Sequence, residues 1–237
     1  QPAWLVDINR IDGLAGISEE NGELVIGAMT RHADLAASEL VRRRCPVLAY
    51  AAGTIGHYAI RQRGTIGGSL AHADPAAQLP LVCVMLDAVI EATSVRGSRR
   101  IEATAFFETV FTTVLEPDEM ITAIRVPVPA GNGGWGFRLF NRRAGDFAEA
   151  SVAAALSTEA GPLGLRLAIG AVGPVPIRVE DMVSAVEPDD EGWPVRAAAE
   201  VAEAAEIEDT VRMPADYRRE VLQALVEDAL REAGSRH

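Results

Sequence analysis

The sequence RQRGTIGGSLAHADP, residues 61–75, carries the most information about the fold and function of this chain. Two adjacent glycines, Gly67 and Gly68, lie between the hydroxyl residues Thr65 and Ser69. Consecutive glycines let neighbouring backbone N–H groups form a concave surface that attracts anions, which suits a diphosphate. The alternative is a tight turn between a helix and a strand. The pattern is neither a Walker loop nor G-x-G-x-x-G, so ordinary ATP and dinucleotide folds are not indicated.

The composition is typical of an acidic globular protein with one large domain or two modest ones. The chain has 237 residues, of which 49% are hydrophobic, and a formal net charge of -12. That charge repels nucleic acid and anionic membranes, so neither is an expected partner. No apolar run approaches the ~18 residues of a membrane span. Cys45 and Cys83 are far apart in apolar segments, which predicts buried free thiols in a reducing cytoplasm rather than a zinc or iron–sulfur site.

Apolar periodicity and capping signals predict an α+β chain in two parts. In the first part we expect strands at 23–30, 88–94 and 117–129 and helices at 31–38, 45–55 and 74–86. The last of these helices would begin with Asp74 as N-cap and Pro75 at its first position. Glycines in AGNGGWG, residues 130–136, indicate a linker, so we place the boundary near 130–135. A three-stranded antiparallel sheet would follow, with helices at 194–207 and 214–234.

No residue outside the glycine segment points to catalytic chemistry. His72 follows Gly68 by four positions and is placed to contact a ligand bound there. His32 and His57 lie near predicted helix starts, where capping and surface roles are commonest. The sequence contains no nucleophile elbow, no His-x-x-x-His metal pair and no pair of carboxylates forced onto one face. We therefore expect no catalytic residue and no metal ligand.

Several longer segments, in order, resemble one family of flavoproteins. They are LVDINRI (5–11), LVIGAMTRHADLAAS (24–38), IGHYAIRQRGTIGGSLAHADPAAQLPLV (55–82) and FRLFNRRAGDFAEASVAAAL (137–156). On these residues the chain is similar to the FAD-binding middle subunit of the molybdenum hydroxylases, such as carbon monoxide dehydrogenase and xanthine dehydrogenase. The resemblance implies an FAD-binding (PCMH-type) domain at 1–130, its second FAD subdomain. It also implies a domain at 135–237 like the C-terminal domain of the carbon monoxide dehydrogenase flavoprotein.

The resemblance also assigns residues to the cofactor. The loop that would wrap FAD is Thr65, Ile66, Gly67, Gly68 and Ser69, with Ser69 where most members have Asn. The other contact positions that the resemblance implies are Ile55, Ile121, Arg138 and Gln78. Many relatives have an acid at the position of Gln78; glutamine keeps acceptor ability but loses the charge.

By the same resemblance, the protein would be an FAD-binding electron-transfer subunit of a cytoplasmic oxidoreductase. Its expected partners are a large subunit with a molybdenum–pterin cofactor and a small subunit with [2Fe–2S] clusters. Electrons would pass from the clusters to FAD and on to NAD, a quinone or oxygen. Members also have an upstream A-G-G-x-S-L loop, which we expect this chain to lack as a truncated form. The second hypothesis is therefore a truncated homologue that binds no FAD and serves as a structural or assembly module.

Overall fold

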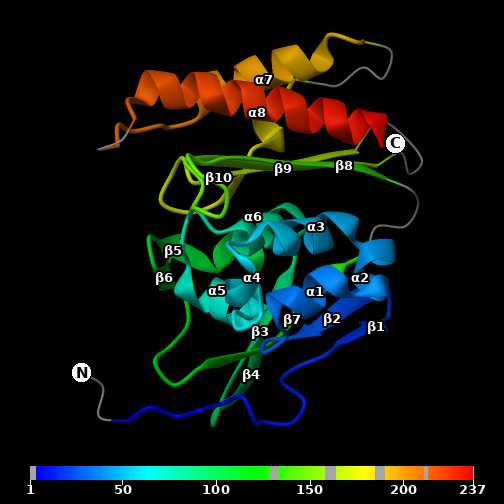
Figure 1. Ribbon diagram of the computed structural model, residues 1–237, viewed down its shortest axis with the longest axis vertical. Helices are drawn as coiled ribbons and strands as arrows, with labels where there is room; N and C mark the ends of the chain where they lie inside the picture. Colours follow the sequence, from blue (N-terminus) through cyan, green and yellow to red (C-terminus); the bar gives the residue numbers. More distant parts are fainter. Residues whose placement is uncertain (1–3, 129–132, 158–163, 185–189, 211–212, 237) are drawn as a thin grey trace.

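The computed structural model describes residues 4–128, 133–157, 164–184, 190–210 and 213–236 (Figure 1). Two antiparallel sheets and two groups of helices alternate along its longest axis. The first sheet, in blue and green, is covered by the helices that the chain forms between the second and third of its strands in sequence order. The second sheet lies between these helices and a C-terminal pair. Among the helices of the described residues, none is both long and apolar enough to span a bilayer. The expected α+β class is confirmed.

The first sheet has five strands in the order β1-β2-β7-β3-β4. The strands are β1 (Ile17–Glu20), β2 (Glu23–Gly27), β7 (Met120–Pro127), β3 (Val89–Ser94) and β4 (Gly97–Glu102). The helices between them are α1 (His32–Ala37), α2 (Glu39–Arg44), α3 (Pro46–Thr54), α4 (Tyr58–Arg61), α5 (Ile66–His72) and α6 (Gln78–Met85). A small hairpin of β5 (Phe107–Thr109) and β6 (Thr112–Thr113) completes this part.

Alternation along the strands places one face of this sheet in the core. Ile26, Ile124 and Ile90 are paired across β2, β7 and β3, and all three are fully buried. Arg125 follows Ile124 and points to the opposite face, where its Nε lies 2.6 Å from Oε1 of Glu91. The period of two is that of a sheet with one buried face. Full burial of each isoleucine contributes about 1.5–3 kcal/mol.

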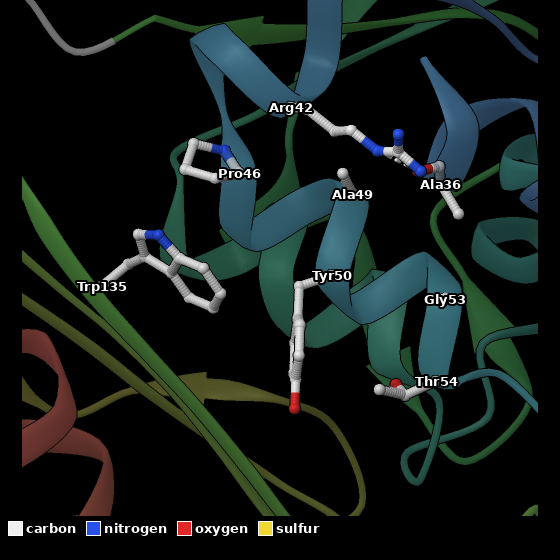
Figure 2. A pocket seen from close by; sticks show the side chains of 8 residues that line it. All are labelled: Ala36, Arg42, Pro46, Ala49, Tyr50, Gly53, Thr54 and Trp135. Carbon is white, nitrogen blue, oxygen red and sulfur yellow. Dashed lines mark hydrogen bonds between the residues drawn. The ribbon is translucent and has the colours of Figure 1, made fainter. Parts of the chain in front are cut away.

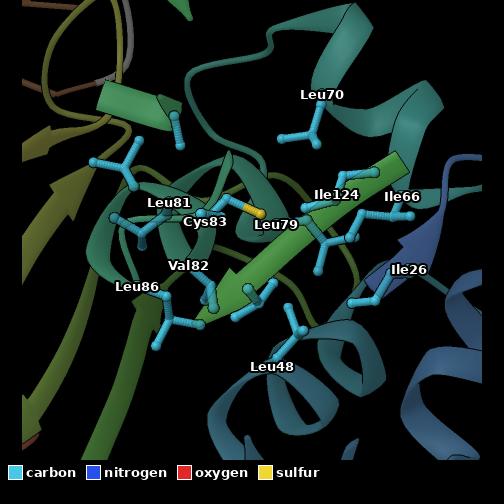
Figure 3. Packing of buried hydrophobic residues seen from close by; sticks show 14 of the residues in the cluster. Ile26, Leu48, Ile66, Leu70, Leu79, Leu81, Val82, Cys83, Leu86 and Ile124 are labelled. Carbon is cyan, nitrogen blue, oxygen red and sulfur yellow. The ribbon is translucent and has the colours of Figure 1, made fainter. Parts of the chain in front are cut away.

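Both parts of the molecule pack on α6. Every residue of this helix is buried, as expected for a helix that is apolar on all sides. On one side Leu79 lies near Ile124 of β7 (Figure 3). On the other side, residues of the second sheet belong to the same cluster. The core is therefore continuous between the two parts.

The second sheet has the order β11-β10-β9-β8 and is covered on its far face by two helices. Its strands are β8 (Gly134–Phe140), β9 (Ala150–Ser157), β10 (Gly164–Gly170) and β11 (Ile177–Arg178), and its helices are α7 (Trp193–Ala204) and α8 (Ala215–Ser235). The short β11 adds a fourth strand to the three that the sequence predicts. The expected boundary near residue 130 lies largely outside the described residues, and the described end of the expected linker, from Gly134, is already strand β8.

One local expectation needs correction. Asp74 does not cap α6; its Oδ1 accepts a hydrogen bond from the N–H of Ala76 at 2.8 Å, which closes a turn before the helix begins at Gln78. Both cysteines are buried free thiols, as predicted. Burial raises the pKa of Cys45 and Cys83 to about 12.

Candidate functional site

The glycine segment forms the first turn of α5 rather than a loop. Thr65 is the N-cap, and its Oγ1 accepts a hydrogen bond from the N–H of Gly68 at 3.1 Å. A threonine with extended backbone at this position is a common helix start. The helix ends at His72, and its C-cap Ala73 adopts a left-handed conformation with φ of 49°.

The backbone amides of this turn are not free, which corrects the expected concave anion site. Ile66 donates to the carbonyl of Thr30 at 3.1 Å, and Gly67 donates to the carbonyl of Ala28 at 2.8 Å. Ser69 donates to the carbonyl of Thr65 at 3.0 Å. With the capping bond that the N–H of Gly68 donates to Thr65, all four N–H groups of residues 66–69 have partners within the chain. A ligand would therefore meet the outer surface of this turn and not a row of bare amides.

The two glycines serve different purposes. A Cβ at Gly67 would lie 2.6 Å from Cβ of Ala28 and 2.8 Å from its carbonyl oxygen, so only glycine lets α5 approach the end of β2. Gly68 is exposed, and a Cβ there would meet only Oγ1 of Thr65, at 2.9 Å. Beside it, the half-buried Ser69 has a hydroxyl with no hydrogen-bond partner among the described residues. We call this surface of Gly68 and Ser69 the bare turn.

Two further predicted residues lie just downstream. His72 is exposed at the end of α5, with its ring 4.9 Å from the ring of Phe111. Gln78 is 7% exposed, yet its side-chain amide forms no hydrogen bond within the described part of the chain. The amide is not among the polar atoms sealed from solvent, so it remains accessible. An accessible amide without a protein partner is suited to hydrogen-bond a ligand.

Two other predicted residues, Ile55 and Ile121, are placed differently. Ile55 ends α3 and is half-buried, and its carbonyl accepts a hydrogen bond from Arg61 at 2.9 Å. Ile121 is 6% exposed and belongs to the core in β7, the strand against which α5 packs. Their side chains mainly pack, so a ligand would reach only their edges.

Arg138 is the predicted residue that lies apart from the glycine segment. It lies on the face of β8 that α8 covers, where its guanidinium pairs with Glu232 of α8. Its neighbour Phe137 points the other way, into the core shared with the first part. Strand alternation therefore turns Arg138 away from the glycine segment.

The segment that leads into the turn is held by two residues that the sequence did not identify as important. Arg31 donates from Nη1 to the carbonyl of Arg63 and from Nη2 to Oδ1 of Asn9. The backbone N–H of His32 donates to the carbonyl of Gly64 at 3.0 Å. The Nε2 of His32 lies 2.9 Å from the carbonyl oxygen of Thr65. His32 is buried rather than at the surface. Its position three residues before the apolar Leu35, on the same helix face, was the sequence feature that could have indicated this burial.

A separate groove lies between α3 and the start of β8 (Figure 2). It has a volume of about 500 Å³, and the rings of Tyr50 and Trp135 stand 5.4 Å apart at its wall. Arg42 lines its other end. None of the predicted cofactor residues lines it. Within the described residues, no cluster of histidine, cysteine or carboxylate side chains is arranged to hold a metal ion.

Comparison with protein families gives two matches that together extend over nearly the whole chain. Residues 1–129 match the FAD binding domain in molybdopterin dehydrogenase. Residues 135–233 match the CO dehydrogenase flavoprotein C-terminal domain.

Curated relatives and solved structures are similar over almost all of the chain. The 6-hydroxypseudooxynicotine dehydrogenase complex subunit alpha of Paenarthrobacter nicotinovorans is 38% identical, over 98% of this chain and 80% of its own length. The carbon monoxide dehydrogenase medium chain of Hydrogenophaga pseudoflava is 36% identical, over 100% and 83%. A structure of quinoline 2-oxidoreductase from Pseudomonas putida 86 superposes with a TM-score of 0.92 at 31% identity, over 99% of this chain and 83% of that one.

Proposed function

The chain belongs to the family of FAD-binding medium subunits of the molybdenum hydroxylases, and from this we propose that it is the flavin electron-transfer subunit of such a complex. The observation that carries the proposal is the match of both family domains, in order, to one chain. The relatives are named as complex subunits or medium chains of dehydrogenases, which supports a division of labour among several polypeptides. We assign the molybdenum–pterin cofactor to a large partner and [2Fe–2S] clusters to a small one.

The bare turn and Gln78 fit a flavin nucleotide. Gly68 presents backbone without a side chain, and a ligand can approach such a surface closely. The free hydroxyl of Ser69 and the amide of Gln78 both donate and accept hydrogen bonds, as the ribityl and phosphate groups require. The internal pairing of the N–H groups of residues 66–69 fixes this surface before a ligand arrives. Pre-organisation of this kind lowers the entropy lost on binding.

When bound, FAD would supply redox chemistry between the clusters and an acceptor such as NAD, a quinone or oxygen. The chain's own residues would bind and orient the cofactor. The candidate site contains no arrangement of acid, base and nucleophile among its described residues, which suits a subunit that transfers electrons and leaves hydroxylation to its large partner.

The proposal is tested by co-expressing the chain with its large and small partners and measuring flavin in the purified complex. We expect bound FAD with visible flavin absorbance that bleaches when the substrate of the large subunit is added without acceptor. The matched control replaces Arg138, whose side chain faces α8, by alanine and should keep its flavin. A complex that assembles without FAD and still turns over would contradict the proposal and favour an assembly module instead.

A further inference from the structure

We propose that His32 is a positioning residue for the flavin site, which through its hydrogen bond to the Thr65 carbonyl holds the turn that presents Gly68 and Ser69. This inference rests on the proposed function for its ligand, but the placement of the turn can be measured without one. It concerns a side chain that touches the backbone of the site and not the cofactor itself.

Hydrogen bonds from the start of α1 hold the backbone of residues 63–65 in place. Three consecutive carbonyls, those of Arg63, Gly64 and Thr65, accept hydrogen bonds from the side chain of Arg31, the backbone of His32 and the side chain of His32, in that order. Two adjacent residues at the start of α1 thus determine the path of the chain into α5. Thr65 is the last of the three, and it is also the N-cap of that helix.

The hydrogen-bond partners of the His32 imidazole determine which of its nitrogens carries the proton. A carbonyl oxygen only accepts, so Nε2 of His32 carries the proton and donates it to Thr65. Nδ1 is buried and has no partner among the described residues. In the charged ring Nδ1 would become a buried donor without an acceptor, which is strongly unfavourable. We call the bonds from Arg31 and His32 to the carbonyls of residues 63–65 the clamp. Nε2 would donate to Thr65 in either state of the ring, but the burial of Nδ1 makes the closed clamp favour the neutral ring.

The His32 ring packs closely against the backbone of Gly64. A Cβ at Gly64 would lie 2.7 Å from Cε1 and 2.8 Å from Nδ1 of His32, so the ring lies directly against the backbone of Gly64. The second glycine-dependent contact of this segment, at Gly67, holds α5 against Ala28 of the strand end. Gly64 and Gly67 thus lie on either side of Thr65; Gly64 packs against the first residue of α1, and Gly67 packs against the residue that follows β2.

The charged groups around the ring give the clamp a dependence on pH. Arg31 and Asp34 lie on its own segment, Arg61 and Arg63 on the segment packed against it, and α3 carries no charged side chain. Burial lowers the pKa of His32, and the Arg31 guanidinium lowers it further, against the opposing effect of the bond to Thr65. The clamp is therefore complete above the ordinary histidine pKa and is weakened as the pH falls below it.

The test is hydrogen–deuterium exchange of the segment 62–70 in the full chain without FAD. His32→Leu removes the donor and should raise the opening of this segment about 2- to 12-fold, since Thr65 keeps its second bond from Ser69. His32→Gln is the matched control, because its amide donates but does not titrate; it should restore protection. Between about pH 8 and pH 5, protection corrected for intrinsic rates should fall in the wild type by up to about tenfold per pH unit and stay flat in His32→Gln.

A parallel FAD titration distinguishes this inference from the proposed function. If the wild type binds FAD, His32→Leu should weaken binding by the same factor and His32→Gln should not. Equal exchange of segment 62–70 in wild type and His32→Leu overturns the inference, whatever FAD does. Absence of FAD binding in the wild-type complex instead overturns the proposed function, while the exchange experiment still decides the role of His32.

Discussion

Adding one methyl group to each of the adjacent glycines should separate their two roles. In Gly67→Ala the methyl would lie 2.6 Å from Cβ of Ala28 and 2.8 Å from its carbonyl oxygen, and neither a Cβ nor a backbone oxygen can turn aside as the end of a flexible side chain can. Overpacking of this kind destabilises by about 1–3 kcal/mol, and strain on the hydrogen bond to Ala28 adds about 1 kcal/mol. The better helix propensity of alanine offsets about 1 kcal/mol. The free energy of unfolding should fall by about 1–3 kcal/mol.

Gly68→Ala should behave in the opposite way. Its methyl would meet only the Thr65 hydroxyl, at 2.9 Å, so a weakened N-cap of about 1 kcal/mol offsets the gain in helix propensity. Stability should stay within about 0.5 kcal/mol of the wild type. FAD affinity should fall at least about tenfold, which is about 1.4 kcal/mol, because the methyl covers the bare turn.

Urea unfolding and FAD titration of both variants measure the two quantities separately. A Gly68→Ala variant with wild-type FAD affinity would refute the assignment of this surface to the cofactor. A Gly67→Ala variant as stable as the wild type would refute the packing argument.

Four further outcomes follow from the same structure. Gln78→Leu should lower FAD affinity about 2- to 12-fold while leaving urea stability unchanged or raised, since the amide has no partner in the described chain; equal affinity would remove Gln78 from the site. Arg138→Ala should leave FAD affinity unchanged and lower stability by about 1 kcal/mol or less, and a loss of flavin would return it to the site. Because the pKa of His32 is lowered in the folded chain, unfolding free energy should fall as pH drops below about 6.5, by at most about 1.4 kcal/mol per pH unit; His32→Gln should remove that part of the slope in pH-dependent urea titrations. Cys45 and Cys83, with pKa values raised to about 12, should react with a thiol reagent only after unfolding, and rapid native labelling would contradict their burial.

Local sequence signals predict most of the elements because they depend on neighbouring residues alone. The helix from Pro46 to Thr54 follows a proline at its first turn, and the strand Val89–Ser94 is rich in β-branched and small residues. Asp74 misleads because an aspartate before proline favours a turn as strongly as a helix start.

Whether the backbone N–H groups of the glycine segment are free or hydrogen-bonded depends on residues far away in the chain. The N–H groups of Ile66 and Gly67 are paired with Thr30 and Ala28, and no local pattern announces those contacts. The face that Arg138 occupies is hard to predict for a different reason, because a shift of one residue along a strand reverses the face on which a side chain lies. The sequence therefore locates the segment and leaves its geometry open.

The most direct test of the whole account is a crystal structure of the chain, within its complex, with FAD bound. The cofactor should lie across Gly68, with the Ser69 hydroxyl and the Gln78 amide at hydrogen-bonding distance and Arg138 still paired with Glu232. FAD bound elsewhere, for example in the groove between Tyr50 and Trp135 with the bare turn in contact with water, would contradict it.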